Sequence, residues 1–167
     1  MASEIPIEFQ HLLRYDSTYN VLICRQCKMA VGKQTLKRHL RERHTLTSKE
    51  RKNLVQALDS VPFVTMENGF PQPLHYSHPV AGLDIHSAYK CKQCDFVTVN
   101  KQSMHRHILK SHPEVEACID RLEGQRWILV KVQRWMATGR GAKLWIVKTA
   151  ADIVYAVWSR FSRLCTV

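Results

Sequence analysis

The spacing of apolar residues predicts short elements in the first part of the chain. Residues 19–23 are rich in Val, Leu and Ile, which predicts a strand that leads into Cys24. Residues 33–43 contain neither Gly nor Pro and place Leu36 and Leu40 four positions apart, which is helical spacing. A strand, a tight turn and a helix are therefore expected in this order.

A second helix is expected to begin after Thr47. The hydroxyl of Thr47 can accept a hydrogen bond from the Glu50 amide while the Glu50 carboxylate reaches back, which is a capping box. The helix would end before Pro62, because proline disfavours helical geometry in the residue before it. Its apolar face would contain Leu54, Val55 and Leu58. Residues 62–88 contain four Pro and two Gly, which predicts a mostly irregular connector.

The pattern recurs in the second half at an offset of about 67 positions, which indicates an internal repeat. Pro113 marks the expected start of another accessory helix, with an apolar face up to Gly124. Residues 127–135 are aromatic and β-branched and fit either a strand or a helix. From Leu144 to Cys165, apolar residues repeat at steps of three and four, which predicts an amphipathic helix.

The charged face of this C-terminal helix argues against a membrane span. Docking on the rest of the chain is the simplest interpretation, and a partner helix or a membrane-surface helix is the alternative. The N-terminal sequence has neither a basic nor an apolar signal region, so we expect an intracellular protein.

Four of the six cysteines lie in two Cys-x2-Cys pairs, which in a reducing compartment favours metal binding over disulfides. The other two, Cys118 and Cys165, stand among apolar residues and are read as small buried side chains. A Cys pair from a turn and a His pair from one helix can meet in a tetrahedron around zinc. The sequence predicts two such sites, Cys24, Cys27, His39 and His44, and Cys91, Cys94, His107 and His112.

The two sites differ in the spacing between their inner ligands. Twelve residues separate Cys94 from His107, which is typical of Cys2His2 fingers, whereas eleven separate Cys27 from His39. The first site therefore requires a tighter turn before its helix. His105 competes with His107, but it lies seven residues, about two turns, from His112, so His107 is preferred.

These elements predict a fold class of small α+β modules that is mostly helical overall. Two ββα-like fingers would each be followed by an accessory helix, with an amphipathic helix at the C-terminus. The expected domains are a first finger module at 8–61, a connector at 62–88, a second finger module at 89–123 and an apolar segment with the terminal helix at 124–167. Two zinc ions per chain are the expected cofactors.

Function is constrained first by what the sequence lacks. It contains no Gly-rich phosphate loop, nucleophile elbow or paired carboxylates, so we expect no enzyme. The 25 Lys and Arg residues outnumber the 14 acidic ones, giving a net charge of +11, which favours polyanionic partners. Nucleic acid is the expected partner, although charge alone does not decide this.

The second module, YKCKQCDFVTVNKQSMHRHILKSH, resembles a Cys2His2 finger in which an aromatic residue, Phe96, closely follows the second cysteine. Met104 takes the usual core position. The resemblance implies base contacts by Asn100, Ser103 and Arg106. In the first module the matching positions are Gly32, Thr35 and Arg38.

The wider arrangement resembles a fungal family named after protein D of the orsellinic acid biosynthesis cluster. YNVLICRQCKMAV, LKRHL, HPVAGLDIHSAYKCKQC and WILVKVQRW carry this likeness, which covers roughly residues 8–147. It implies a paired-finger module that often leads a longer protein.

Two functions are compatible with these patterns. The first is a nuclear DNA-binding protein, DNA being favoured over RNA, in a regulatory, chromatin or recombination context. Because 46 residues separate His44 from Cys91, tandem base reading is disfavoured and phosphate contacts fit better. The second is a zinc-scaffolded module for protein–protein interaction without nucleic acid, in which the C-terminal helix contacts the partner.

Overall fold

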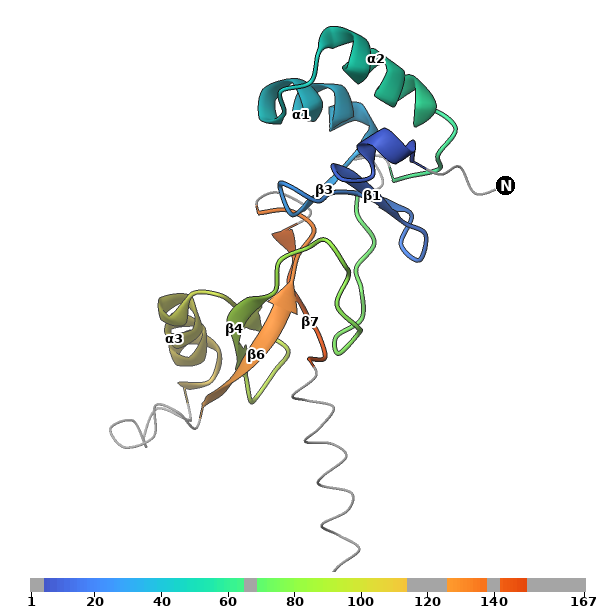
Figure 1. Ribbon diagram of the computed structural model, residues 1–167. Coiled ribbons are helices and arrows are strands. Elements are labelled where there is room, and N and C mark those ends of the chain that lie inside the picture. Colours follow the sequence, from blue (N-terminus) through green and yellow to red (C-terminus); the bar gives the residue numbers. More distant parts are fainter. Residues whose placement is uncertain (1–4, 65–68, 114–125, 138–141, 150–167) are drawn as a thin grey trace, which may run out of the picture. The chain divides into compact units, whose positions relative to one another are not determined.

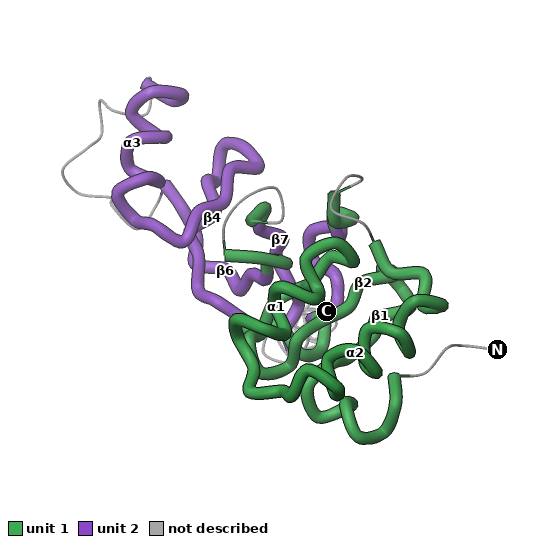
Figure 2. Tube along the Cα trace, turned by 90° about the horizontal axis from the view of Figure 1, so that it is seen from above, with its two compact units in different colours: residues 1–72, 80–84, 134–143 green, residues 73–79, 85–133, 144–167 purple. Residues whose placement is uncertain are grey.

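A computed structural model describes residues 5–64, 69–113, 126–137 and 142–149 of the chain. The chain divides into two compact units (Figure 2). The first unit contains residues 1–72, 80–84 and 134–143, and the second contains residues 73–79, 85–133 and 144–167. Each unit therefore includes a segment that is distant in the sequence from its main part.

The first unit combines a three-stranded antiparallel sheet, in the order β1-β2-β3, with two α-helices (Figure 1). Its elements are the 3-10 helices η1 (Ile7–Phe9) and η2 (Lys33–Thr35), the strands β1 (Leu13–Asp16), β2 (Val21–Cys24) and β3 (Met29–Val31), and the helices α1 (Leu36–Arg43) and α2 (Ser48–Ala57). The predicted strand before Cys24 is the central strand β2, and all four of its residues are buried.

A hairpin joins β1 to β2 and was not predicted from the sequence. The turn is held by the Asp16 carboxylate, which accepts a hydrogen bond from the Tyr19 amide at 3.1 Å. Asn20 adopts a left-handed φ of 53°, a conformation that asparagine tolerates, and its side chain accepts from the Tyr15 hydroxyl at 2.7 Å. These contacts stabilise the turn through which β1 pairs with β2, the strand that ends at Cys24.

The core of the first unit lies between the sheet and the two α-helices. Leu36 and Leu40 of α1 meet Leu54 of α2 and Leu58, the residue that caps α2, and all four are buried. The predicted capping box is confirmed: the Thr47 hydroxyl accepts from the Glu50 amide, and the Glu50 carboxylate accepts from the Thr47 amide. The accessory helix of the first finger therefore begins where the sequence indicates.

Trp135, from a distant part of the sequence, completes this unit. Its carbonyl accepts from the Ala30 amide of β3 at 2.8 Å, and its indole N–H donates to the Pro71 carbonyl at 2.6 Å. The Tyr19 ring meets it edge-on with centroids 5.5 Å apart, and only 2% of Trp135 is exposed. The indole thus fills a buried position in the first unit.

The second unit is built on a four-stranded antiparallel sheet in the order β5-β4-β6-β7. Its elements are β4 (His86–Cys91), β5 (Val97–Thr98), α3 (Lys101–Ser111), β6 (Trp127–Gln133) and β7 (Trp145–Ile146). Beyond β7, the Ile146 carbonyl accepts from the Tyr76 amide at 2.7 Å, and the Ser77 carbonyl accepts from the Lys148 amide at 2.9 Å. Residues of the connector therefore cover the outer edge of the short strand β7.

The expectation of a mostly helical chain built from ββα fingers is wrong. Among the described residues, seven strands contain about as many residues as three α-helices. Each finger hairpin is extended by further strands, β1 in one unit and β6 with β7 in the other. Residues 127–133, which fitted either a strand or a helix, form the strand β6, which pairs with β4 along most of its length and with β7 at Val132 and Gln133. This pairing satisfies backbone groups that a buried strand cannot leave unpaired.

The predicted C-terminal helix is corrected at its start, where Trp145 and Ile146 form the strand β7 and pair with Gln133 and Val132 of β6. The rest of that helix, the accessory helix after Pro113, Cys118 and Cys165 lie outside the described residues. Within the described ranges, no helix has the length and apolarity needed to cross a membrane.

Candidate metal centres

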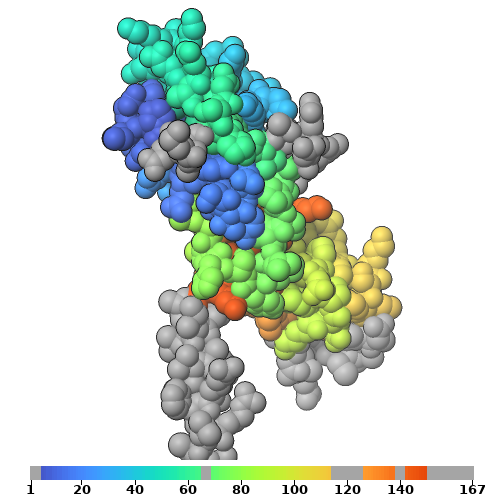
Figure 3. Space-filling model, turned by 90° about the vertical axis from the view of Figure 1, so that its right-hand side faces the viewer, coloured from blue at the N-terminus to red at the C-terminus, as the bar shows by residue number. Residues whose placement is uncertain are grey.

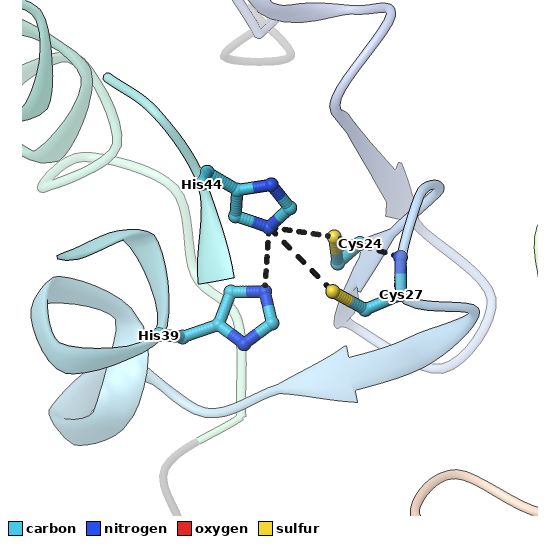
Figure 4. Close-up of side chains that lie close together, drawn as sticks. All are labelled: Cys24, Cys27, His39 and His44. Atoms are coloured by element: carbon cyan, nitrogen blue, oxygen red, sulfur yellow. Dashed lines mark hydrogen bonds between the residues drawn. The ribbon is translucent and has the colours of Figure 1, made fainter. Parts of the chain in front are cut away.

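The first predicted ligand set comes together between two elements of the first unit. Cys24 ends β2 and Cys27 follows it in the turn before β3, whereas His39 projects from α1 and His44 caps the end of that helix. Figure 4 shows the two thiols and the two imidazoles pointing toward one another. The shortened spacing is accommodated by the 3-10 turn η2 (Lys33–Thr35) before α1.

The distances between these atoms fit the edges of a tetrahedron. His44 Nε2 lies 3.3 Å from Cys24 Sγ, 3.6 Å from Cys27 Sγ and 3.2 Å from His39 Nε2. With Zn–S bonds of about 2.3 Å and Zn–N bonds of about 2.0 Å, tetrahedral edges are about 3.3 to 3.8 Å long. The donor atoms are therefore spaced as a zinc ion at their centre requires.

Burial shifts the pKa values of three ligands of the first site toward their neutral forms. It raises the pKa of the Cys24 thiol to about 11. Burial, followed by the charges of His44 and Arg43, lowers the pKa of His39 to about 4, and burial also lowers the pKa of His44. The imidazoles are thus neutral ligands near neutral pH, while the thiolates need a nearby positive charge.

The second ligand set is assembled in the same way in the second unit. Cys91 ends β4, Cys94 follows in the turn, His107 lies on α3 and His112 caps that helix. Cys94 Sγ lies 3.2 Å from His107 Nε2, and the four ligand atoms at each site all lie within 4.8 Å of one another. Met104 is fully buried beside this site, as the resemblance to a finger implied.

Aromatic side chains support the second site. The Phe96 ring stacks on His107 with centroids 4.1 Å apart and an interplanar angle of 21°. Trp127 of β6 is paired with Cys91 and packs in the same cluster, edge-on to Tyr89. Trp127 was not assigned to the site from the sequence, because the pairing of β6 with β4 is not visible there.

The electrostatics of the second site agree with those of the first. Burial raises the pKa of Cys94, and burial followed by the charge of His112 lowers the pKa of His107. His105, the alternative ligand, is exposed on α3 and does not belong to the group of donor atoms. The preference for His107 is therefore confirmed.

Two cysteines and two histidines at tetrahedral spacing are the donor set of structural zinc sites, in which four protein ligands close the coordination shell. The chain can therefore hold two zinc ions, one in each unit. The predicted cofactor is confirmed in this sense, and the ligand groups are the predicted ones.

Gln26 contacts the first site and was missed by the sequence reasoning. Its Oε1 lies 3.1 Å from His44 Nδ1. A signal was present, since both knuckles read Cys-x-Gln-Cys, with Gln26 in the first and Gln93 in the second. A glutamine at the same place in both motifs could have been considered as a hydrogen-bond partner of the ligands, because ligating histidines commonly bond to such groups through their free nitrogen.

The four residues proposed for nucleic-acid contact lie on the two finger helices. Arg38 and Arg106 are exposed. Asn100 caps α3, where its Oδ1 accepts from the Ser103 amide at 3.0 Å. The Ser103 hydroxyl in turn accepts from Arg106 at 3.4 Å.

The comparison with known families gives a match over both ligand sets. The model of the family described as "Orsellinic acid/F9775 biosynthesis cluster protein D" matches residues 11–113. This chain belongs to that family. In this member of the family, both Cys2His2 groups lie within the matched residues.

A curated member of the orsellinic acid family is similar to this chain. It is the orsellinic acid/F9775 biosynthesis cluster protein D of Emericella nidulans, which is 29% identical over 120 residues. The aligned part is 70% of this chain and 24% of the relative, so the chain spans about a quarter of that protein. No solved structure matches the chain.

Proposed function

We propose that this zinc-binding chain binds DNA through phosphate contacts made by basic helical faces. The observation that carries the proposal is the charge of residues 33–52, which contain eight Lys and Arg and two Glu. Both acidic side chains have local partners, since Glu42 pairs with Arg41 at 3.3 Å and Glu50 caps α2. The excess positive charge of this segment is therefore not neutralised within it.

The basic side chains of this segment are available to a large partner. Lys37, Arg38 and Arg43 on α1 and Lys49 and Lys52 on α2 are exposed, and among the described residues none of these five pairs with an acidic side chain. The region of α2 is coloured teal to green in the space-filling view (Figure 3). Exposed cations of this kind bind phosphates and release counterions.

Phosphate contact is favoured over base reading because most residues at base-reading positions are used internally. In the first finger Gly32 is buried and its carbonyl accepts from the Thr35 hydroxyl at 3.0 Å. In the second finger Asn100 and Ser103 are joined by the cap of α3. Arg38 and Arg106 are exposed on α1 and α3, and both can reach phosphates as readily as bases.

DNA is proposed as the nucleic acid because α1 and α3 expose basic side chains and each follows a Cys-x2-Cys turn, as the helices of DNA-binding zinc fingers do. A nuclear site of action, in a regulatory, chromatin or recombination context, follows from that choice of ligand. Direct comparison of binding to duplex DNA and to RNA of the same sequence tests it, and a preference for RNA would reverse this part of the proposal.

The test of the proposal is a salt titration with matched charge variants. The double variant Lys37→Gln with Arg38→Gln removes two exposed charges from α1, and Arg14→Gln with Lys28→Gln removes two exposed charges elsewhere in the first unit. We expect wild-type affinity for DNA to fall steeply between about 50 and 200 mM salt, and the α1 variant to reduce the slope of log K against log salt by about two. The control pair is expected to keep the wild-type slope.

Binding that does not change with salt, or equal losses in both double variants, would refute phosphate contact by α1. Such a result would favour the second candidate, a protein-interaction module. Exposed apolar residues of β6 support that candidate, since Ile128 is 42% and Leu129 is 71% exposed. Affinity for an apolar partner changes little with salt.

A further inference from the structure

Gln26 links the cysteine turn of the first metal site to the histidine at the end of α1. Its side-chain Oε1 lies 3.1 Å from His44 Nδ1, and Gln26 stands in the chain between the ligands Cys24 and Cys27. One residue thus connects ligands that arrive from different elements.

The contact with Gln26 determines which nitrogen of His44 carries a proton. An amide oxygen is only an acceptor, so Nδ1 must be the donor and the lone pair must be on Nε2. Nε2 is the atom that faces both sulfurs, at 3.3 and 3.6 Å. The opposite orientation of the amide would place the proton on Nε2, where it would block coordination.

Among the described residues, the second site has no glutamine contact of this kind with a ligand histidine. Gln93 occupies the same place between the cysteines, but its side chain is exposed and has no histidine partner among the described residues. In that site the counterpart of His44 is His112, while the ring of His107, the counterpart of His39, stacks on Phe96. The two sites therefore orient their histidines by different contacts.

We propose that Gln26 is a positioning residue of the first metal site, which fixes the tautomer and the orientation of His44 and thereby strengthens zinc binding there. Partners of this kind, which bond to the free nitrogen of a ligating histidine, typically change metal affinity by about 10- to 100-fold. Because the bond to Gln26 is exposed, an effect near the lower end is expected. This proposal does not depend on nucleic-acid binding.

The test uses Gln26→Ala and Gln26→Glu, with Gln93→Ala as the matched control. Zinc would be withdrawn from the full chain with a competing chelator while the His44 and His107 ring signals are followed separately by NMR. We expect Gln26→Ala to weaken zinc binding at the first site about tenfold and to speed solvent exchange of the His44 Nδ1 proton. Gln26→Glu keeps an acceptor and is expected to retain wild-type affinity.

Gln93→Ala is expected to leave both sites unchanged. The proposal is overturned if Gln26→Ala leaves the first site unaltered, if Gln26→Glu loses as much affinity as Gln26→Ala, or if the two Ala variants act alike. A general loss of stability from the exposed turn would move both His44 and His107 signals, whereas the positioning role moves His44 alone.

Discussion

The ligand cysteines need a bound cation to take the thiolate form in which they coordinate zinc. Burial holds the Cys24 and Cys94 thiols toward their neutral forms, yet zinc binds thiolates. The same burial keeps His39 and His107 neutral, which suits coordination. Folding of each site and binding of its ion are therefore expected to be coupled.

Replacing single histidines of α3 tests the assignment of ligands. We expect His107→Ala to lower the zinc content from two equivalents to one, because it removes a donor 3.2 Å from Cys94 Sγ. His105→Ala removes an exposed imidazole from the same helix and is expected to retain both equivalents. Elemental analysis after dialysis distinguishes these outcomes, and loss of an ion in His105→Ala would show that the assignment is wrong.

Acidification should weaken the folded chain. The pKa of His39 falls from 6.5 to about 4 on folding, so between these values the unfolded chain binds more protons and stability decreases as the pH falls. Protons also compete with zinc for the thiolates, which acts in the same direction. Melting temperatures measured at constant total zinc are expected to fall from about pH 7 to about pH 4, and a maximum near pH 5 would contradict this.

Elements whose signals are local were predictable. The capping box of α2 depends on Thr47 and Glu50 alone, and the ligands depend on spacing within a short segment, so both were found from the sequence. Strand partners are not local: β6 pairs with β4 across the second finger, and β1 is joined to β2 by a turn whose signal was overlooked. The C-terminal helix was predicted from steps of three and four between apolar residues, a pattern that does not reveal that Trp145 and Ile146 pair with β6.

The cap of α2 gives a measurable contribution to stability. Thr47→Ala removes the hydroxyl that accepts from the Glu50 amide at 3.2 Å, and we expect a loss of about 1 kcal/mol in the free energy of unfolding. Thr45→Ala is the control, because Thr45 is an exposed residue just before the helix that makes no such bond. Denaturant melts of the zinc-loaded chain measure both, and equal effects would refute the capping role.

The two units are not consecutive pieces of sequence. Residues 134–143 belong to the first unit and residues 73–79 to the second, so a division at the connector would remove a part of each. The boundaries expected from the sequence were placed at Pro, Gly and motif positions. Such positions indicate where the chain turns, but they do not indicate which hydrophobic core a distant residue packs into. Trp135 shows the difference, since it lies 111 positions after Cys24 yet is buried in the same unit.

Trp135→Ala tests this arrangement. Removal of a fully buried indole is expected to destabilise the first unit by about 3 to 5 kcal/mol. Zinc would then dissociate from the first site at a lower denaturant concentration than from the second, as followed by the His39 and His107 signals. Ile7→Ala, at a side chain that is 84% exposed, is the control; equal sensitivity of the two sites in Trp135→Ala would contradict the assignment of Trp135 to the first unit.

The central claim is that the chain binds two zinc ions, one at each Cys2His2 group, and that each ion stabilises the fold of the unit that contains it. Titration of the metal-free chain with zinc, followed by both metal content and circular dichroism, tests it most directly. We expect binding to saturate at two equivalents, with helical and strand signals gained on binding and lost on chelation. Saturation at fewer than two equivalents, or an unchanged spectrum after complete removal of the metal, would contradict the claim.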